Sequence, residues 1–266
     1  MQHNLFVQAN KCLLASSFKQ KAKLLIKLQH DWANGLLNLN PVKVSDINLC
    51  GIPSKLRLVP SSQLPKRNIN SKTGLAALFH SIAHIEFCAI NLALDAVCRF
   101  QDMPEDYYSD WISVANDERQ HFELIENKLK TLNFNYGDFA AHDGFWRTAV
   151  ETADDVLVRM TLIPRVLEAR GLDVSPAIIT KLDNINEQEG VKILKHILKE
   201  EVNHVAIGTK WFNFLCKLRK LDTSTAFKDI VETRFHGELK APFNIPLRIA
   251  AGFNKHEINY LKNINV

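Results

Sequence analysis

The chain has 266 residues, 46% of them hydrophobic, and a net charge of +4. This length supports one large domain or a core with an appendage, and the mild charge neither requires nor excludes an anionic partner. Without a run of about 18 apolar residues or an apolar N-terminal stretch, we expect no membrane span and no signal peptide. Five scattered cysteines without a C-x-x-C pair predict reduced thiols and a cytoplasmic protein.

The N-terminal part, residues 1–73, is predicted to be a helical segment followed by an extended connector. Residues 1–40 carry apolar residues among polar ones in a helical pattern, whereas prolines interrupt residues 41–73. The connector also carries six basic residues: Lys43, Lys55, Arg57, Lys66, Arg67 and Lys72. A basic segment can bind nucleic acid, but a solvated surface is the preferred interpretation.

Four long amphipathic helices are predicted after the connector, over 74–101, 105–131, 144–170 and 190–218. Each places apolar residues three and four positions apart on one face. The first two connections are short, and the third, over 171–190, is longer and holds its own helix after Pro176. Pro164 is expected to kink the third helix. The prediction is therefore an all-α fold, with a four-helix bundle over 74–218 and an appendage over 219–266 packed on it.

Six potential metal ligands lie on the apolar faces of these four helices. They form two Glu-x-x-His pairs, each preceded by one glutamate: Glu86, Glu118, His121, Glu168, Glu201 and His204. The lone glutamate precedes its pair by 32 residues in the first hairpin and by 33 in the second. This length fits half a helix, a turn and half a helix back, and residues three apart share a helix face. Each hairpin is therefore predicted to bring its three ligands to one level.

Ferritin-like di-iron and di-manganese bundles use this inventory of side chains. Buried carboxylates are costly unless paired or metal-bound, and oxygen and nitrogen donors without thiolates suit iron or manganese. We predict two metal ions bridged by Glu118 and Glu201. Each ion is completed by the lone glutamate and the histidine of one hairpin, so that four carboxylates balance two divalent cations. The competing interpretation is that these are ordinary exposed residues of helices. It accounts for one Glu-x-x-His pair more readily than for two pairs, each with its preceding glutamate.

Three further residues are predicted to lie behind the ligands. Asp117 and Glu200, each preceding a ligand glutamate, are candidates for hydrogen bonds to the histidine of the opposite hairpin. His84 shares a helix with Glu86, together with His80, and a supporting role is preferred over metal ligation for both histidines.

Several segments of the chain resemble one known family: the bacterial ferritin-like proteins known only as a domain of unknown function, a group related to rubrerythrins and bacterioferritins. The segments that carry the resemblance are Gly51-Ile52-Pro53, Leu58-Val59-Pro60, His84-Ile85-Glu86, Asp117 to His121, Phe145-Trp146, Arg165 to Asp173, Glu201 to Val205 and Ala241 to Asn244. The resemblance implies a ferritin-like bundle and carries the metal ligands over to the same six positions. The chain departs from the family pattern at Asn91, where a second acidic residue often follows, and at Glu200, which replaces Asp.

Three functions are compatible with these patterns. The first is an oxidoreductase that activates O2 or peroxide to oxidise an organic or macromolecular substrate, with a separate electron donor. The second is a metal-binding or oxidative-stress protein without an organic substrate. The third is a tRNA-modifying hydroxylase, for which the basic connector and Lys217, Arg219 and Lys220 are the support. No membrane partner is expected, and exposed apolar residues such as Trp32 are compatible with a homodimer.

Overall fold

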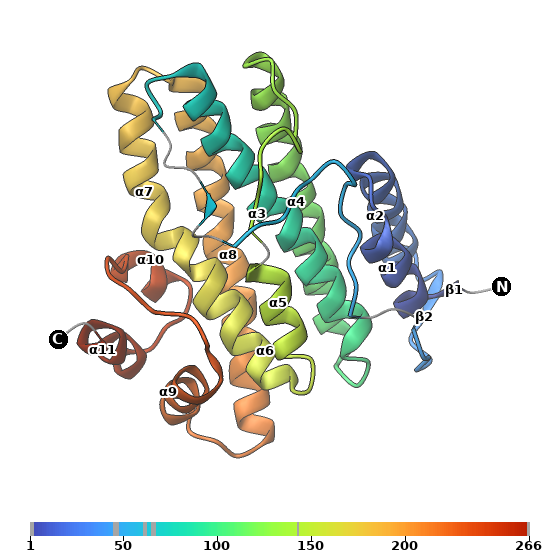
Figure 1. Ribbon diagram of the computed structural model, residues 1–266. Coiled ribbons are helices and arrows are strands. Elements are labelled where there is room, and N and C mark those ends of the chain that lie inside the picture. Colours follow the sequence, from blue (N-terminus) through green and yellow to red (C-terminus); the bar gives the residue numbers. More distant parts are fainter. Residues whose placement is uncertain (1–2, 45–47, 61–62, 65–67, 143, 265–266) are drawn as a thin grey trace. The chain divides into compact units, whose positions relative to one another are not determined.

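The computed structural model describes residues 3–44, 48–60, 63–64, 68–142 and 144–264. The chain forms two compact units, Met1–Val150 and Glu151–Val266 (Figure 1). Helices dominate both units, which confirms the all-α prediction. The boundary between the units falls inside the segment 74–218, which we predicted to be one bundle, so the three-part division and the bundle stay predictions.

Two helices and a short strand pair form the N-terminal part of the first unit. Strand β1 (His3–Asn4) precedes α1 (Leu5–Leu14) and α2 (Phe18–Ala33), and β1 pairs in parallel with β2 (Leu37–Asn38). The helical prediction for residues 1–40 is thus confirmed in outline, with a break between α1 and α2. The break follows from local chemistry, because Ser17 caps α2 by accepting a hydrogen bond from the amide of Gln20.

The described residues of the connector after β2 form mainly turns and irregular chain, and backbone hydrogen bonds join them to α1 and to the segment near Ala141. The Gly51 amide donates to the Leu13 carbonyl (2.8 Å), and the Val59 amide donates to the Ala141 carbonyl (2.8 Å). Gly51 permits this close contact, since a Cβ atom there would lie 2.3 Å from the Ala15 carbonyl oxygen. The basic residues Lys66 and Arg67 lie outside the described residues.

A hairpin of two long helices forms the core of the first unit. Helices α3 (Lys72–Arg99) and α4 (Glu105–Thr131) pack side by side, and α4 has the predicted bounds. By length and composition α3 passes as a membrane span, which the sequence reading did not anticipate. However, 72% of its most apolar window is buried within the protein, as in the core helix of a soluble protein.

The predicted single helix over 144–170 is wrong, because the chain breaks before Val156. Helix α5 (Gly144–Glu151) is followed by a turn and then by α6 (Val156–Leu162). Asp155 caps α6 by accepting from the Leu157 amide and also pairs with Arg219 at 2.7 Å. The cap and the ion pair explain why a new helix begins at this residue.

The helix predicted after Pro176 is present, as the second half of α7 (Ala169–Asn184), but the interruption predicted between residues 171 and 176 is wrong because helical structure continues through it. A π-helix, η2 (Ile163–Glu168), contains Pro164 and leads directly into α7. Pro176 has no amide hydrogen to donate to the Leu172 carbonyl, which would normally stop the helix. That carbonyl instead accepts a hydrogen bond from the side-chain amide of Asn244 (3.2 Å).

The remainder of the second unit is helical. Helix α8 (Gln188–Leu218) packs against α6, η2 and α7, and it is followed by α9 (Thr223–Arg234), α10 (Ile245–Ala250) and α11 (Lys255–Asn263). The π-helix η2 lies so close to α8 that a Cβ atom on Gly208 would be 2.3 Å from the Pro164 ring. Glycine leaves the space that this contact needs. The expected Pro164 kink therefore takes the form of a π-helical segment that packs on a glycine.

Two buried arginines connect the C-terminal helices to η2 and α7. Arg165 donates to Glu257 at 2.8 Å and lies over the rings of Phe212, Phe227 and Phe253. Arg248 forms a two-pronged pair with Asp173 at 3.0 and 2.7 Å. Each buried arginine is neutralised by its carboxylate, although Arg165 Nη1, Arg248 Nη1 and Glu257 Oε1 have no hydrogen-bond partner within the described residues. The two ion pairs join α10 and α11 to α7 and η2 within the second unit.

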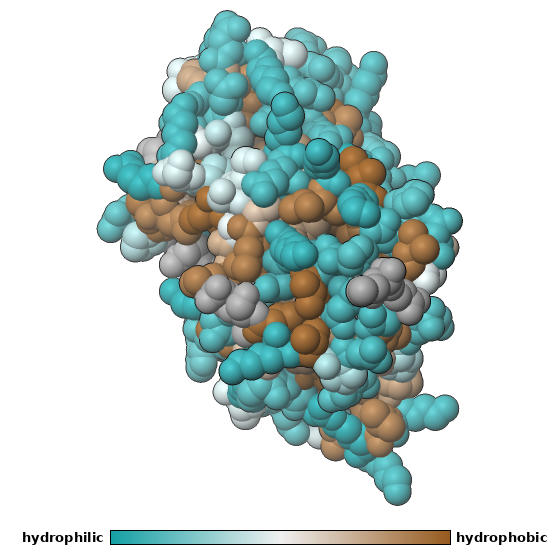
Figure 2. Space-filling model, turned by 90° about the vertical axis from the view of Figure 1, so that its right-hand side faces the viewer, coloured by the Kyte–Doolittle hydropathy of each residue, from teal (hydrophilic) through white to brown (hydrophobic). Residues whose placement is uncertain are grey.

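Apolar side chains reach the surface in small groups, as Figure 2 shows for one face of the molecule. The side chain of Trp32, which we expected to be exposed, is half-buried. Its indole nitrogen donates to Ser109 Oγ (3.0 Å), and its ring meets the edge of Tyr108. The support that Trp32 lent to a homodimer is therefore withdrawn, and the oligomeric state stays a prediction.

Candidate metal centre

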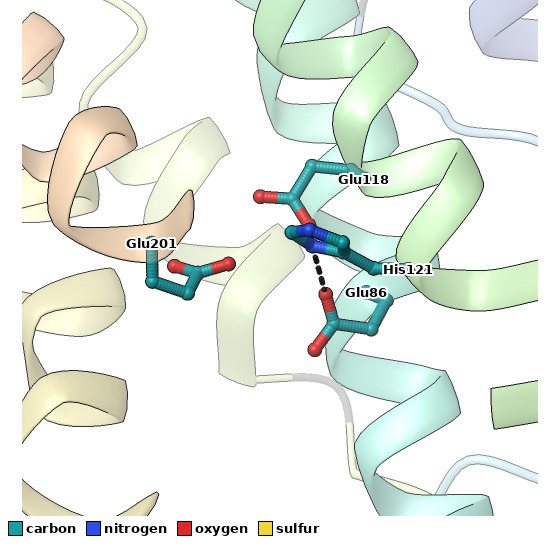
Figure 3. Close-up of side chains that lie close together, drawn as sticks. All are labelled: Glu86, Glu118, His121 and Glu201. Carbon is teal, nitrogen blue, oxygen red and sulfur yellow. Dashed lines mark hydrogen bonds and ion pairs between the residues drawn. The ribbon is translucent and has the colours of Figure 1, made fainter. Parts of the chain in front are cut away.

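Three of the predicted ligands meet in the core of the first unit. Glu86 comes from α3, and Glu118 and His121 come from adjacent turns of α4. All three are buried, with exposed fractions of 5%, 1% and 0%. His121 Nδ1 lies 3.2 Å from Glu86 Oε2 and 3.3 Å from Glu118 Oε2 (Figure 3). Each residue offers a ligand atom within 4.8 Å of those of the others, so the hairpin places its three predicted ligands at one level.

The two carboxylates determine the charge of this histidine. Burial lowers the pKa of His121, but hydrogen bonds and charge from Glu118 and Glu86 outweigh burial and raise it to about 11. The metal-free imidazole is therefore protonated at neutral pH, and its Nδ1–H donates to both carboxylates. The Nδ1 proton lies between the imidazole and the two carboxylates.

The other three predicted ligands lie in the second unit. Glu201 and His204 are one turn apart on α8, with 3.5 Å between Glu201 Oε1 and His204 Nδ1. Glu168 is the last residue of η2, which packs against α8. His204 and Glu168 are buried, and the side chain of Glu201 is nearly so. The second unit thus repeats the inventory of the first, and the joining of the two triads into one centre stays a prediction.

The residues predicted to support the ligands have varied surroundings. His84 Nε2 donates to the His142 carbonyl (2.9 Å) and Nδ1 accepts from the Tyr136 hydroxyl (2.8 Å), so these hydrogen bonds involve none of the six ligands. Glu200 is half-buried and lies 3.6 Å from His196. Asp117 is also half-buried. The predicted hydrogen bonds of Asp117 and Glu200 to the opposite histidines are not tested by these contacts.

Tyr136 is the residue near the first triad that sequence reasoning missed. Its ring packs against those of His80, Phe87 and Phe122, and Phe87 and Phe122 follow Glu86 and His121 directly in sequence. Burial raises the pKa of its phenol, so it stays protonated and donates to His84. Tyr136 lies between two predicted helices, where no periodic pattern distinguishes a packed side chain from an exposed one.

Comparison with known proteins places both triads inside one family match. A family model described as "Protein of unknown function (DUF455)" matches residues 14–259. An uncharacterised protein of Haemophilus influenzae is 38% identical over 271 residues, which cover 97% of this chain and 93% of that protein. No solved structure matches the chain. Neither description includes an activity, so the chemistry of the side chains must carry the functional argument.

Proposed function

The chain belongs to the DUF455 family, and we propose that its two Glu-Glu-His triads together hold two iron or manganese ions in a ferritin-like four-helix bundle. The observation that carries the proposal is the first triad, in which two buried carboxylates and one buried imidazole converge on a single proton. Ionisable side chains are costly in a helical core unless they are paired with one another or bind a metal ion, and this arrangement of oxygen and nitrogen atoms allows both. The repetition of the same residues in the second unit supports a pair of ions.

The donor atoms of the triads fit these metals. Carboxylate oxygens and imidazole nitrogens, without thiolates, suit iron and manganese. None of the six positions is a cysteine, and the described cysteines are free thiols elsewhere. In the proposed centre Glu118 and Glu201 bridge the ions, Glu86 and His121 complete one, and Glu168 and His204 complete the other. Four carboxylates then neutralise two divalent cations, which makes burial of the centre less costly.

The most specific role for this centre is that of an oxidoreductase. When bound, a pair of redox-active ions supplies electrons for the reduction of O2 or peroxide. The chain's own residues keep the ligands in place and exclude water, since no residue of the first triad is more than 5% exposed. His121 gives up its Nδ1 proton when a metal binds. The substrate that such an enzyme oxidises and its electron donor have no counterpart among the described features.

Metal loading is expected to release protons, because His121 is charged in the metal-free protein. Its pKa rises from 6.5 to about 11, so the favourable charge is present at neutral pH and is lost only as pH rises through about 11. At pH values between 6.5 and about 11, each metal ion that binds to His121 displaces one proton. The apparent affinity for the metal therefore rises about tenfold per pH unit. Calorimetric titration of Mn2+ in two buffers of different ionisation enthalpy measures this release.

A matched variant isolates the proton of His121. His121→Gln keeps a side chain of similar size without an ionisable group and is expected to release at least one proton fewer per ion bound. Equal proton release by the wild type and this variant would contradict the protonated state, whereas loss of all metal binding in the variant would confirm His121 as a ligand.

The direct test of the proposal is metal analysis of protein purified without chelator, followed by anaerobic loading with Fe2+ and exposure to O2. We expect about two ions per chain and an oxygen-dependent absorption band in the near ultraviolet. Failure to bind either iron or manganese would refute the proposed centre. Binding without a response to O2 or peroxide would instead favour the metal-binding alternative over the oxidoreductase.

The tRNA-hydroxylase alternative has less support from the contacts. Two of the basic residues on which it depends are in ion pairs, Lys55 with Asp138 and Arg219 with Asp155. Steep, salt-dependent retention of the protein on a polyanion column would restore this alternative.

A further inference from the structure

The π-helix η2 is held between α8 and the C-terminal helix α11. The Pro164 ring lies against Gly208 of α8, where a Cβ atom would be 2.3 Å away. The next residue, Arg165, donates from Nε to the Thr209 hydroxyl of α8 (3.2 Å) and from Nη2 to Glu257 of α11 (2.8 Å). Two consecutive residues thus fix η2 against both of its neighbours.

These contacts lie one turn before Glu168, the predicted metal ligand at the end of η2. Helix α7 continues η2, and a turn of three residues, 185–187, leads back into α8, so η2 and α8 run antiparallel. Glu168 follows Pro164 by four residues, and His204 precedes Gly208 by four. The contact between Pro164 and Gly208 therefore brings Glu168 level with His204, another predicted ligand, and both are buried.

The π-helical form of η2 determines the direction in which Glu168 points. Its hydrogen bonds reach back five residues instead of four, as from the Ala169 amide to the Pro164 carbonyl. One turn then holds about one residue more than an α-helical turn, and one residue is a rotation of about 100° around a helix. If η2 were α-helical, Glu168 would point in a different direction relative to α6.

Two buried ion pairs hold the chain on either side of Glu168. Arg165, three residues before it, pairs with Glu257 of α11, and Asp173, five residues after it, forms the two-pronged pair with Arg248 of α10. We call these two contacts the anchor pairs. All four side chains are 5% exposed or less.

Stability alone does not account for the anchor pairs. Apolar residues of similar size are often as stabilising as a buried ion pair, or more so. A charged, two-pronged contact differs from apolar packing because it fixes a direction as well as a distance. Pro164 favours a departure from the α-helix, but a proline can equally kink or end a helix. The anchor pairs supply the directed contacts that select one geometry for the segment that contains Glu168.

We propose that the anchor pairs are positioning groups, which hold Glu168 in the direction that lets it share a metal ion with His204. The inference rests on the proposed function, because it requires a metal ion at these two residues. None of the four side chains of the anchor pairs is a proposed ligand. They act through the backbone of η2 and α7, so the C-terminal helices complete the metal site without contacting the metal.

The test uses two double variants, each of which replaces one anchor pair with apolar residues: Arg165→Met with Glu257→Leu, and Arg248→Met with Asp173→Leu. Each removes both charges, so we expect the fold to be retained, and the second variant serves if the first does not fold. Metal-free protein is titrated with Mn2+, and electron paramagnetic resonance counts the free ion. We expect two tightly bound ions in the wild type. In each folded double variant one ion should bind about 10–100-fold more weakly, the range for groups that orient a ligand.

A control variant separates positioning from loss of stability. Leu182 is completely buried in α7, 14 residues after Glu168, and Leu182→Ala is expected to lower stability while both ions bind as in the wild type. A wild type without metal would refute the proposed function. Two equally tight ions in a folded double variant, when the wild type also binds two, would overturn only the positioning role.

Hydrogen exchange of the metal-free protein gives a second readout. We expect the amides of η2 and of the first turn of α7 to exchange at least tenfold faster in the double variants than in the wild type, and those of α8 to keep their rates. Equal acceleration over α8 would indicate general loosening of the second unit and would overturn the positioning role. Unchanged exchange in η2 would do so too, because Pro164 and Gly208 would then suffice to hold the π-helix.

Discussion

Replacing Glu118 with alanine is expected to reduce the metal content from about two ions per chain to none, since a bridging carboxylate serves both ions. Glu118 is buried to 1% exposure and its Oε2 atom lies 3.3 Å from His121 Nδ1, so its removal also takes away a carboxylate that holds the histidine. Elemental analysis after gel filtration gives the stoichiometry. Glu201→Ala is expected to have the same effect from the second unit.

The distinction between bridging and terminal ligands sharpens this test. Glu86→Ala removes a carboxylate proposed to contact a single ion, and we expect it to retain about one ion per chain. The control is Glu123→Ala on the same helix, whose side chain is 42% exposed and paired with Arg119. Retention of one ion by Glu118→Ala would reassign Glu118 as a terminal ligand, and full metal content would remove it from the ligand set.

The first triad was predictable because its geometry is local. Glu118 and His121 are one helical turn apart, and the short connection near residue 101 returns the chain directly from α3 to α4. The helix bounds follow from local features too, such as Ser71, whose hydroxyl accepts from the Gly74 amide at the start of α3. Periodicity and capping therefore suffice to bring Glu86 level with the pair.

The errors in the second unit arise where distant residues decide local structure. Pro176 and Gly171 both predict an interruption, yet Asn244 satisfies the carbonyl that Pro176 leaves without a donor. Asp155 reads as a surface residue until Arg219 is placed beside it. In each case the partner lies more than 60 residues away in sequence, beyond the reach of any pattern of three or four positions.

The packing of the connector was also beyond sequence reasoning. The Gly51 and Val59 amides donate to the carbonyls of Leu13 and Ala141, which lie far from them in sequence. Segments without periodicity give no information about such packing. The sequence therefore predicts which helix residues are candidate metal ligands better than it predicts which surfaces the connector covers.

The largest loss of stability is expected from Glu257→Ala, by about 3–5 kcal/mol, because it leaves the buried Arg165 without its counter-charge. Arg165 is completely buried, and its other contacts include the Thr209 hydroxyl and three aromatic rings at 4.2–4.7 Å, which carry no charge. The nearby Arg248 has the same charge and cannot replace the carboxylate. Glu257 Oε2 also accepts from the Asn254 amide and completes the capping box of α11. Denaturant unfolding measures the free energy of unfolding of each variant.

Three comparisons separate the buried charge from the cap. Glu257→Gln keeps the acceptor for Asn254 but not the charge, so we expect a loss smaller than that of alanine. Glu238→Ala breaks the exposed pair with Lys240 and should change stability by no more than about 1 kcal/mol. The double variant Arg165→Met, Glu257→Leu removes both charges and should recover much of the loss. If the double variant is as unstable as Glu257→Ala, packing and the cap, and not the unpaired charge, determine the stability of this part of the second unit.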